Sequence, residues 1–350
     1  MLIKKDKILT IDKYIQEALY NKKNGYYMSF NPFGAGGDFI TAPNISILFS
    51  EMLAIWIISF WEHLKCPKKF NLIELGAGNG EMMKDIIKSF ERFPLFKDSC
   101  KINILEKSLH LKKIQKTKLK NKKIKWLKNL DELSNIPSIF IANEFFDALP
   151  IKQFIKKKNR WYERNIKISK LKKPEVIEIL ANMKNLKKKL GFNITYNQNF
   201  IEFSPQLFKY LKKISRKINI CNGGILIIDY GYKDHQMKDT LQSVLNHKYN
   251  NLLNNFKEAD ITYNLSFKLV EKIFKKFNLK ISGISSQKKF LINLGILKRA
   301  EIISKKLTFS QKADIYYRVQ RIINKNSMGE LFKVMMATKK NTKFKTGFSN

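Results

Sequence analysis

The chain has 350 residues, and with 44% of them hydrophobic it can bury a substantial core as one elaborated domain or two. It carries 67 lysines and arginines against 29 aspartates and glutamates, a formal net charge of +38. No apolar run reaches the roughly 20 residues of a membrane span, and the three scattered cysteines, with no C-x-x-C pair, argue against a disulfide framework or a zinc site.

The positive charge has two interpretations. Lysine clusters such as residues 112–125 and 184–189 would suit nucleic acid or an anionic membrane. The excess is mostly lysine, however, and it is spread over the whole chain. Such a distribution is typical of lysines on solvated helix faces. The clusters also lack an aromatic-glycine RNA-binding motif, so base stacking has no obvious platform. We therefore expect loose, salt-sensitive association with polyanions and no specific nucleic-acid partner.

The N-terminal part is predicted to hold an amphipathic helix over residues 10–20, followed by a glycine-rich loop over residues 25–43. No apolar signal segment precedes the helix, so we expect a bacterial-type cytoplasmic protein. The loop mixes glycines with aromatic residues and two prolines, which indicates an ordered loop. Asp38 and Thr41 are candidate polar contacts to a ligand, although a purely structural turn competes with that interpretation.

Residues 71–80 are the most informative stretch. An apolar strand runs into a turn with Gly76, Gly78 and Gly80 at alternate positions, and helical spacing of apolar residues resumes over residues 82–87. Glycine there lets the backbone approach a ligand closely, and the amides at the start of the helix favour polar or anionic groups. The sequence therefore predicts a nucleotide-cofactor loop.

The spacing of the glycines decides which cofactor is expected. The third glycine of a dinucleotide fingerprint would fall at Glu81, which argues against a nicotinamide cofactor. The pattern is instead E-x-G-x-G-x-G from Glu74, which resembles the first motif of class I S-adenosylmethionine methyltransferases. A second contact is expected where the next strand ends, because a carboxylate there can accept both ribose hydroxyls. Glu106 is that acid, although an isolated glutamate would be interpreted as a surface residue.

Polar residues also follow the strand predicted at residues 138–142. The carboxyl end of a strand beside the glycine turn faces the binding crevice of an open parallel sheet, so Asn143, Glu144 and Asp147 should meet whatever enters. The alternative is that the acids cap a helix, which suits Asp147 better than Glu144.

Further strands at residues 123–127, 223–231, 279–284 and 331–337 would complete a seven-stranded, mostly parallel α/β sheet. The connection over residues 151–222 is too long for a plain crossover and predicts an inserted substrate-side subdomain. We expect an N-terminal helical extension with the glycine-rich loop (1–65), the cofactor-binding half of the core (66–150), the inserted subdomain (151–222), the second half with a helical insertion (223–340) and a frayed tail (341–350).

Seven sequence blocks together resemble the MidA family of class I methyltransferases. The specific ones read Gly-Asp-Phe-Ile-Thr-Ala-Pro and Ala-Asn-Glu-Phe-Phe-Asp-Ala-Leu-Pro; the blocks are residues 25–27, 37–43, 74–76, 142–150, 229–231, 259–262 and 328–333. Two departures stand out. The family turn usually reads Gly-Pro-Gly-Arg-Gly where this chain has Ala77 and Asn79, and Asn44 stands where an acid usually follows Thr-Ala-Pro. Neither departure removes a glycine.

This resemblance implies a Rossmann-like methyltransferase fold with S-adenosyl-L-methionine as cofactor. The family's mitochondrial relatives are complex I assembly factors that symmetrically dimethylate an arginine, so the resemblance implies a protein substrate such as a respiratory complex I subunit. A homodimer is a further expectation. The expected cofactor-binding residues are Glu74, Gly76, Gly78, Gly80, Glu106, Asn143 and Thr41, and no metal site is expected.

An arginine acceptor is protonated in water and a poor nucleophile, so carboxylates must grip it and receive its charge or proton. Glu144 is the first candidate for that catalytic role, followed by Asp147 and Asp38. Two alternatives stay open. A nucleic-acid methyltransferase would share the fold, although the Pro-Pro-Tyr common after the asparagine in base-amine methylation is missing. The other is an assembly factor that binds the cofactor without turnover.

Overall fold

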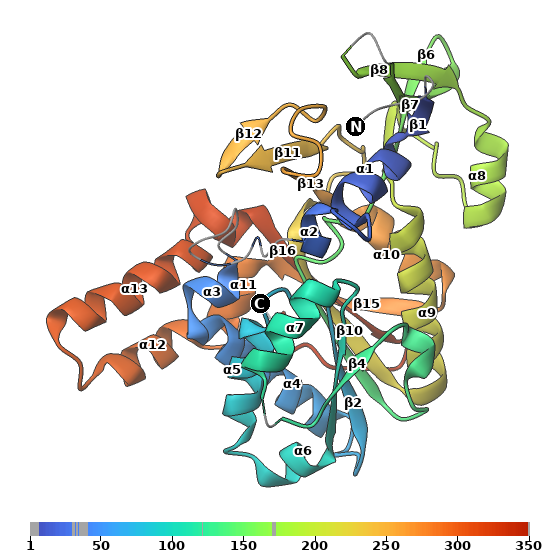
Figure 1. The fold of residues 1–350 in the computed structure, drawn as a ribbon. Coiled ribbons are helices and arrows are strands. Elements are labelled where there is room, and N and C mark those ends of the chain that lie inside the picture. Colours follow the sequence, from blue (N-terminus) through green and yellow to red (C-terminus); the bar gives the residue numbers. More distant parts are fainter. Residues whose placement is uncertain are drawn as a thin grey trace.

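One mostly parallel sheet forms the centre of the computed structural model, which describes residues 7–29, 32, 34, 41–120, 122–169 and 173–348 (Figure 1). In spatial order its strands are β15 (Leu279–Ser286), β16 (Phe332–Lys339), β10 (Gly223–Tyr232), β5 (Ser138–Asn143), β2 (Phe70–Leu75), β3 (Cys100–Leu105) and β4 (Ile124–Leu127). The pairs from β10 to β4 are parallel, whereas β16 runs antiparallel to both neighbours. The expected α/β fold with a mostly parallel sheet is confirmed.

The predicted count of seven strands is one short. A strand of two residues, β14 (Leu265–Ser266), pairs in parallel with the end of β10. A strand of two residues is too short to show alternating apolar and polar residues, and that alternation over several residues is the signal that predicts a strand.

Helices cover both faces of the sheet, so the central strands are buried on both sides. In β5, Phe140 and Ala142 belong to one hydrophobic core and Ile139 and Ile141 to the other, following the two-residue alternation of a strand. Residues of the first core lie on α1 (Ile11–Tyr20), α2 (Tyr26–Ser29), α9 (Pro205–Cys221) and α10 (Phe267–Lys276). Those of the second lie on α3 (Ala42–Ile45), α4 (Ile47–His63), α5 (Glu81–Phe90), α6 (Pro94–Ser99), α11 (Gln287–Asn293), α12 (Ile296–Ser304) and α13 (Phe309–Ile323).

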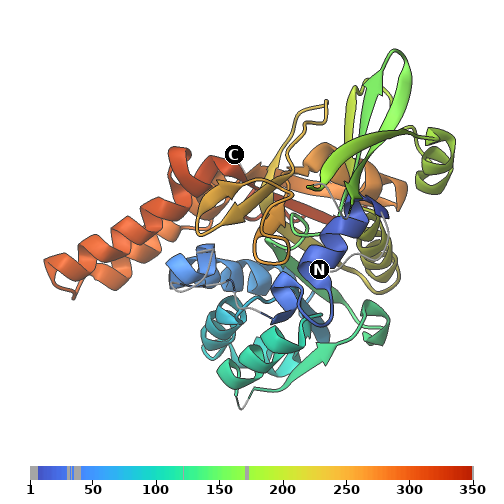
Figure 2. The same cartoon turned by 45° about the horizontal axis from the view of Figure 1, so that its top comes forward.

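Two smaller antiparallel sheets flank the central one. The first holds β1 (Lys7–Thr10), β6 (Lys152–Lys157), β7 (Arg160–Ile168), β8 (Glu175–Leu180) and β9 (Phe200–Phe203), and the basic helix α8 (Met183–Leu190) follows β8. The second holds β11 (Gln242–Leu245), β12 (Lys248–Asn250) and β13 (Asp260–Thr262), and it lies beside α1 and α2 in both views (Figures 1 and 2). The predicted domain boundaries stay predictions, but α9 contacts β5, β10 and β16 and so packs on the central sheet.

The two ends of the chain are both packed. The predicted N-terminal helix forms α1, and it buries Tyr14 and Leu19 as expected. The predicted frayed tail is wrong for residues up to 348, because Phe344 is buried against α4 and Trp56 Nε1 donates to the Thr346 carbonyl at 3.2 Å. The burial of the Phe344 ring holds this segment against the fold, although the residues around it are mostly polar.

The remaining helices lie at the edges of the fold. They are α7 (Leu109–Lys118), which packs against α2, and the short turns η1 (Leu130–Glu132) and η2 (Lys325–Gly329). The α12–α13 hairpin projects from the body of the molecule (Figures 1 and 2). Within the described ranges, no helix has both the length and the apolar character needed to cross a membrane.

Candidate active site

The glycine turn joins β2 to α5 in a conformation that favours glycine. Gly76, Gly78 and Gly80 have φ angles of 68°, 51° and 79°, in the left-handed region. A Cβ atom on Gly76 would also lie 2.7 Å from Cδ2 of Phe145, so the backbone angle and the neighbouring ring both require glycine. The predicted strand, turn and helix are therefore all present.

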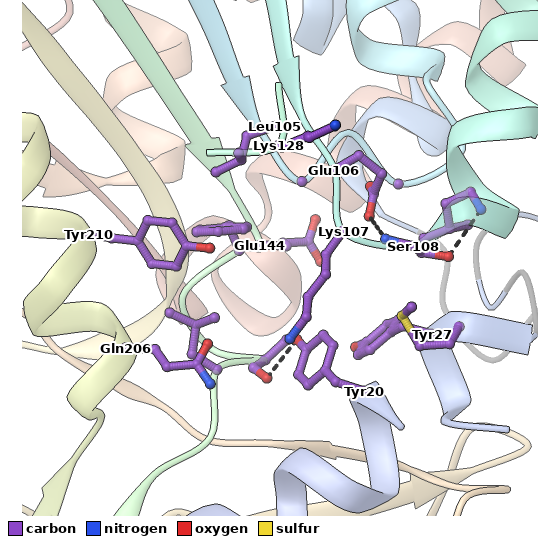
Figure 3. A pocket seen from close by; sticks show the side chains of 17 residues that line it. Tyr20, Tyr27, Leu105, Glu106, Lys107, Ser108, Lys128, Glu144, Gln206 and Tyr210 are labelled. Carbon is purple, nitrogen blue, oxygen red and sulfur yellow. Dashed lines mark hydrogen bonds between the residues drawn. The ribbon is translucent and has the colours of Figure 1, made fainter. Parts of the chain in front are cut away.

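A first cavity of about 280 Å³ opens beside this turn (Figure 3). Gly76 and Gly78 line it, Glu106 stands where β3 ends, and the cavity also has an aromatic wall. The wall consists of Tyr20, Tyr27, Phe145 and Tyr210. A cavity with one acid, exposed backbone and aromatic rings suits a flat, polar-edged group such as a nucleoside.

Glu106 is held in place by its neighbours. Its Oε1 accepts a hydrogen bond from the Ser108 amide at 2.8 Å, and its Oε2 accepts one from Gln115 Nε2 at 2.9 Å. The same Gln115 amide group donates to the Gly78 carbonyl at 2.9 Å, so one buried side chain ties the acid to the glycine turn. Sequence reasoning missed Gln115, because a glutamine on a basic helix carries no signal of its own.

A second cavity also borders the turn, and unpartnered acceptors line it. Glu74 is 2% exposed and its Oε2 has no hydrogen-bond partner among the described residues, and neither does Oδ1 of Asn143. Burial, with a contribution from the charge of Glu106, raises the pKa of Glu74 to about 8. Buried acceptors without donors are costly, so this cavity suits a ligand that brings N–H donors or a positive charge.

The two departures from the family pattern meet in this second cavity. Asn79 Nδ2 donates to Asn44 Oδ1 at 2.9 Å, and Asn44 Nδ2 donates to the hydroxyl oxygen of Thr41 at 2.7 Å. The chain thus has a neutral hydrogen-bonded pair at the two positions where the family pattern has an arginine and an acid. Thr41, a predicted cofactor contact, is held at the cavity through this pair.

Glu144 lies where three cavities meet, since it lines the first, the second and a third. Its φ of 50° is strained for a non-glycine residue. Its backbone amide donates to the Ile228 carbonyl at 2.9 Å and Asn143 Nδ2 donates to its Oε1 at 3.1 Å, which fixes the carboxylate at the junction. Burial raises the pKa of Glu144 to about 7.

The third cavity, of about 340 Å³, has an acidic wall. Glu144, Asp147 and Asp260 line it together with Tyr27 and Tyr230. Asp147 is buried and its Oδ1 has no described partner, and burial beside other carboxylates, Asp229 first among them, raises its pKa well above the usual range. Tyr27 donates its hydroxyl proton to Asp260 Oδ1 at 2.8 Å. Such a cavity favours a cationic ligand.

Asp229 supports the site from beneath. Its Oδ2 accepts from the amides of Phe146 and Asp147 at 3.0 and 3.3 Å, and its Oδ1 accepts from the Tyr230 amide at 3.0 Å. It lines none of the three cavities, so it positions the loop that carries Glu144 and Asp147.

The structure brings most of the predicted site residues together. Glu74, Gly76, Gly78, Glu106, Asn143, Glu144, Asp147 and Thr41 all line one of the three cavities. Gly80 lines none of them and starts α5 instead, and Asp38 lies outside the described residues. Tyr27 and Asp260 were not singled out, although both lie in the blocks that carry the family resemblance. Among the described residues, no three His, Cys, Asp or Glu side chains could hold a metal ion.

Comparisons with known proteins agree with this geometry. A family model described as "Putative S-adenosyl-L-methionine-dependent methyltransferase" matches residues 52–285. The protein arginine methyltransferase NDUFAF7, mitochondrial, of Xenopus laevis is 30% identical over 93% of this chain and 80% of its own length. The protein of the same name from Homo sapiens is 28% identical over 93% of this chain and 78% of its own length. A Burkholderia thailandensis protein, solved with S-adenosyl-homocysteine bound, has the same fold, with a TM-score of 0.79 and 21% identity over 98% of this chain and 89% of that one.

The relatives correct one expectation. The chain was expected to be cytoplasmic because no targeting segment was recognised, but the Xenopus laevis and human relatives, and a further one from Caenorhabditis elegans, are all named mitochondrial. The cytoplasmic assignment is therefore withdrawn.

Proposed function

Because this chain belongs to the family of S-adenosyl-L-methionine-dependent methyltransferases, we propose that it methylates a nitrogen of an arginine side chain in a protein. One observation carries the proposal: the Glu144 carboxylate lies where the cavities beside the glycine turn meet a third cavity walled by acids. The relatives named protein arginine methyltransferases support it.

The residues beside the turn fit the cofactor. Glu106 has the position and hydrogen-bonding capacity to accept from ribose hydroxyls. The unpartnered oxygens of Glu74 and Asn143 suit the ammonium group at the amino-acid end of the cofactor. Gly76 and Gly78 have no side chains and line both cavities, so the backbone can approach a ligand closely there. We therefore assign the nucleoside to the first cavity and the amino-acid end to the second.

The third cavity would hold the acceptor. When bound, the cofactor supplies a methyl group on a sulfonium, which is a strong electrophile. The arginine nitrogen would form a bond to the methyl carbon as the carbon–sulfur bond breaks, and the proton lost from that nitrogen would pass to a carboxylate. Glu144 is placed for this transfer, and a pKa of about 7 lets it accept and release a proton near neutral pH. Asp147 and Asp260 would grip the guanidinium.

Alignment would supply much of the rate. The strained backbone of Glu144 is held by its bond to the Ile228 carbonyl, and Asp229 holds the amides of the two residues after Phe145. A carboxylate fixed in this way loses little freedom when the acceptor arrives. Asp147 follows β5 of the central sheet and Asp260 begins β13 of a separate small sheet, so the third cavity would hold the guanidinium between acids of two different elements.

We extend the proposal to symmetric dimethylation of a respiratory complex I subunit. This finer assignment rests on the family resemblance of the sequence blocks. The acidic wall of the third cavity argues against nucleic acid as the acceptor, because the carboxyl groups of Glu144, Asp147 and Asp260 can stabilise a positive charge and give a phosphate group no favourable partner.

The test is transfer of labelled methyl from S-adenosylmethionine into a lysate of cells that lack this protein, in nuclease-treated and protease-treated halves. We expect label in a protein, on arginine, insensitive to nuclease and absent with the Glu144→Gln variant. Label lost to nuclease would refute the arginine proposal in favour of nucleic acid. No label despite measured cofactor binding would refute it in favour of an assembly factor without turnover.

A further inference from the structure

The small sheet β11–β13 forms one wall of the acceptor cavity. Val244 lies directly opposite Asp260 on one side and Tyr249 on the other, and Gln242 lies opposite Thr262. Residues directly opposite one another in a sheet project from the same face. All five line the third cavity, so one whole face of this sheet is turned toward the acceptor.

Exposure changes steeply along this wall. Asp260 is 2% exposed, whereas Tyr249, two strands away, is 85% exposed at the rim. Lys248, beside Tyr249, also lines the cavity, is exposed and forms no ion pair with any described residue. The wall therefore runs from a buried acid to a solvated aromatic ring and a free lysine.

The rim is held by a tight hairpin. Asn246 and His247 both have positive φ angles, 51° and 61°, which is the conformation of a two-residue turn between antiparallel strands. Such a turn fixes the register of Lys248 opposite Leu245. Lys248 therefore lies one position before Tyr249, at the rim of the third cavity, which it helps to line.

We propose that this rim reads the sequence around the target arginine, and that Lys248 selects an acidic residue near it. The proposal rests on the arginine methyltransferase function above. Asp147 and Asp260 in the third cavity bind the guanidinium of the target arginine. Lys248 at the rim then favours a carboxylate on the same substrate segment, and the ring of Tyr249 offers a flat surface to the backbone of that segment.

The dimensions of the sheet set the spacing of that acid. Asp260 and Tyr249 are separated by two strand-to-strand steps, about 10 Å in all. An extended segment advances about 3.3 Å per residue. The selected carboxylate should therefore lie within about three residues of the methylated arginine.

The overall charge does not explain such a preference. A net charge of +38 attracts any acidic protein, wherever its acids lie. Selection by Lys248 depends instead on the position of the acid in the segment. The experiment must therefore compare positions, and it needs a second lysine variant with the same change of net charge.

The test uses peptides with a single arginine and either aspartate, asparagine or lysine at the third position on each side, with kcat/KM for labelled methyl transfer as the readout. The wild type should prefer the aspartate peptide to the lysine peptide by roughly tenfold. Lys248→Glu should abolish or invert that preference, and cofactor affinity should stay unchanged because Lys248 does not line the first two cavities. Lys188→Glu, on exposed α8, is the matched control and should keep it.

Equal transfer to the three peptides, or an unchanged preference in Lys248→Glu, would overturn this proposal and leave the methyltransferase function standing. If only intact protein is methylated, the labelled arginines mapped from the lysate provide the same test, since sites without an acid within about three residues contradict the proposal. Absence of arginine methylation on peptides and in the lysate alike would overturn both proposals.

Discussion

The Glu144→Gln substitution tests the electrostatics of the site and its chemistry separately. Glutamine keeps the size of the side chain and cannot ionise. Glu144 is half-buried at the junction of the cavities, and its pKa rises from the ordinary 4.5 to about 7 because burial penalises the charged form. The folded protein therefore binds a proton at this position over a pH range in which the unfolded chain does not.

The size of the stability effect follows from that shift. A raised carboxyl pKa contributes stability that is fully present below the unfolded value of 4.5 and is lost as the pH rises through about 7. At 1.36 kcal/mol per pKa unit, the loss is roughly 3 kcal/mol. The variant does not titrate there, so its stability relative to the wild type should rise by roughly 3 kcal/mol between about pH 4 and about pH 8. Asp229 loses a neighbouring charge in the variant, which acts in the same direction.

Urea denaturation at a series of pH values measures this difference, with Glu258→Gln as the control because Glu258 is exposed and lies in none of the cavities. Methyl transfer is measured in parallel. In the wild type, kcat/KM should rise about tenfold between pH 6 and pH 8, as a group with a pKa of about 7 ionises. The variant should lose transfer, and cofactor binding is measured separately because Glu144 also lines the two cofactor cavities. A stability difference that is flat with pH would refute the burial argument, and full transfer in the variant would refute the role of Glu144.

Three further substitutions probe the supports of the site. Gly76→Ala should weaken S-adenosylhomocysteine binding by at least about tenfold in calorimetry, because its Cβ would meet Phe145, whereas Gly295→Ala, with a φ of 87° and open space around it, should not. Glu106→Gln should weaken the same binding by roughly tenfold, the effect of one charge-assisted hydrogen bond, and an unchanged affinity would remove the ribose assignment. Asp229→Asn should lower the free energy of unfolding by about 1–3 kcal/mol, because an amide group replaces one acceptor oxygen of a carboxylate that takes three backbone amides; denaturation with no loss would contradict that support.

The central sheet could be predicted because its signals are local. β2, β5 and β10 are short apolar runs bounded by turn residues, and the glycine turn carries its own spacing. The acids at the carboxyl ends of β3 and β5 then follow from the rule that these ends share one edge of a parallel sheet. The structure places Glu106 and Glu144 around one cavity, while their chemical roles stay predictions.

The parts that could not be predicted depend on partners far away in the chain. β11 and β13 are short, and their pairing is what makes them strands. Asp229 lies inside a buried strand, and its function appears only when it is seen to accept amides from residues 146 and 147, more than 80 positions earlier. Gln115 is similar, since its contacts to Glu106 and Gly78 come from packing of α7. No spacing in the sequence encodes such contacts.

The net charge of +38 and the acidity of the site bear on the same question. The whole chain has 67 lysines and arginines to 29 acids, yet the three cavities are lined by five acids and only three lysines within the described residues. If the charge served a polyanionic substrate, basic residues should gather where the acceptor enters. The reverse distribution, with Glu144, Asp147 and Asp260 around the third cavity, is what a cationic acceptor requires. The lysine excess lies mostly outside these cavities, and the chemistry of the site is better judged from its own residues than from the composition of the chain.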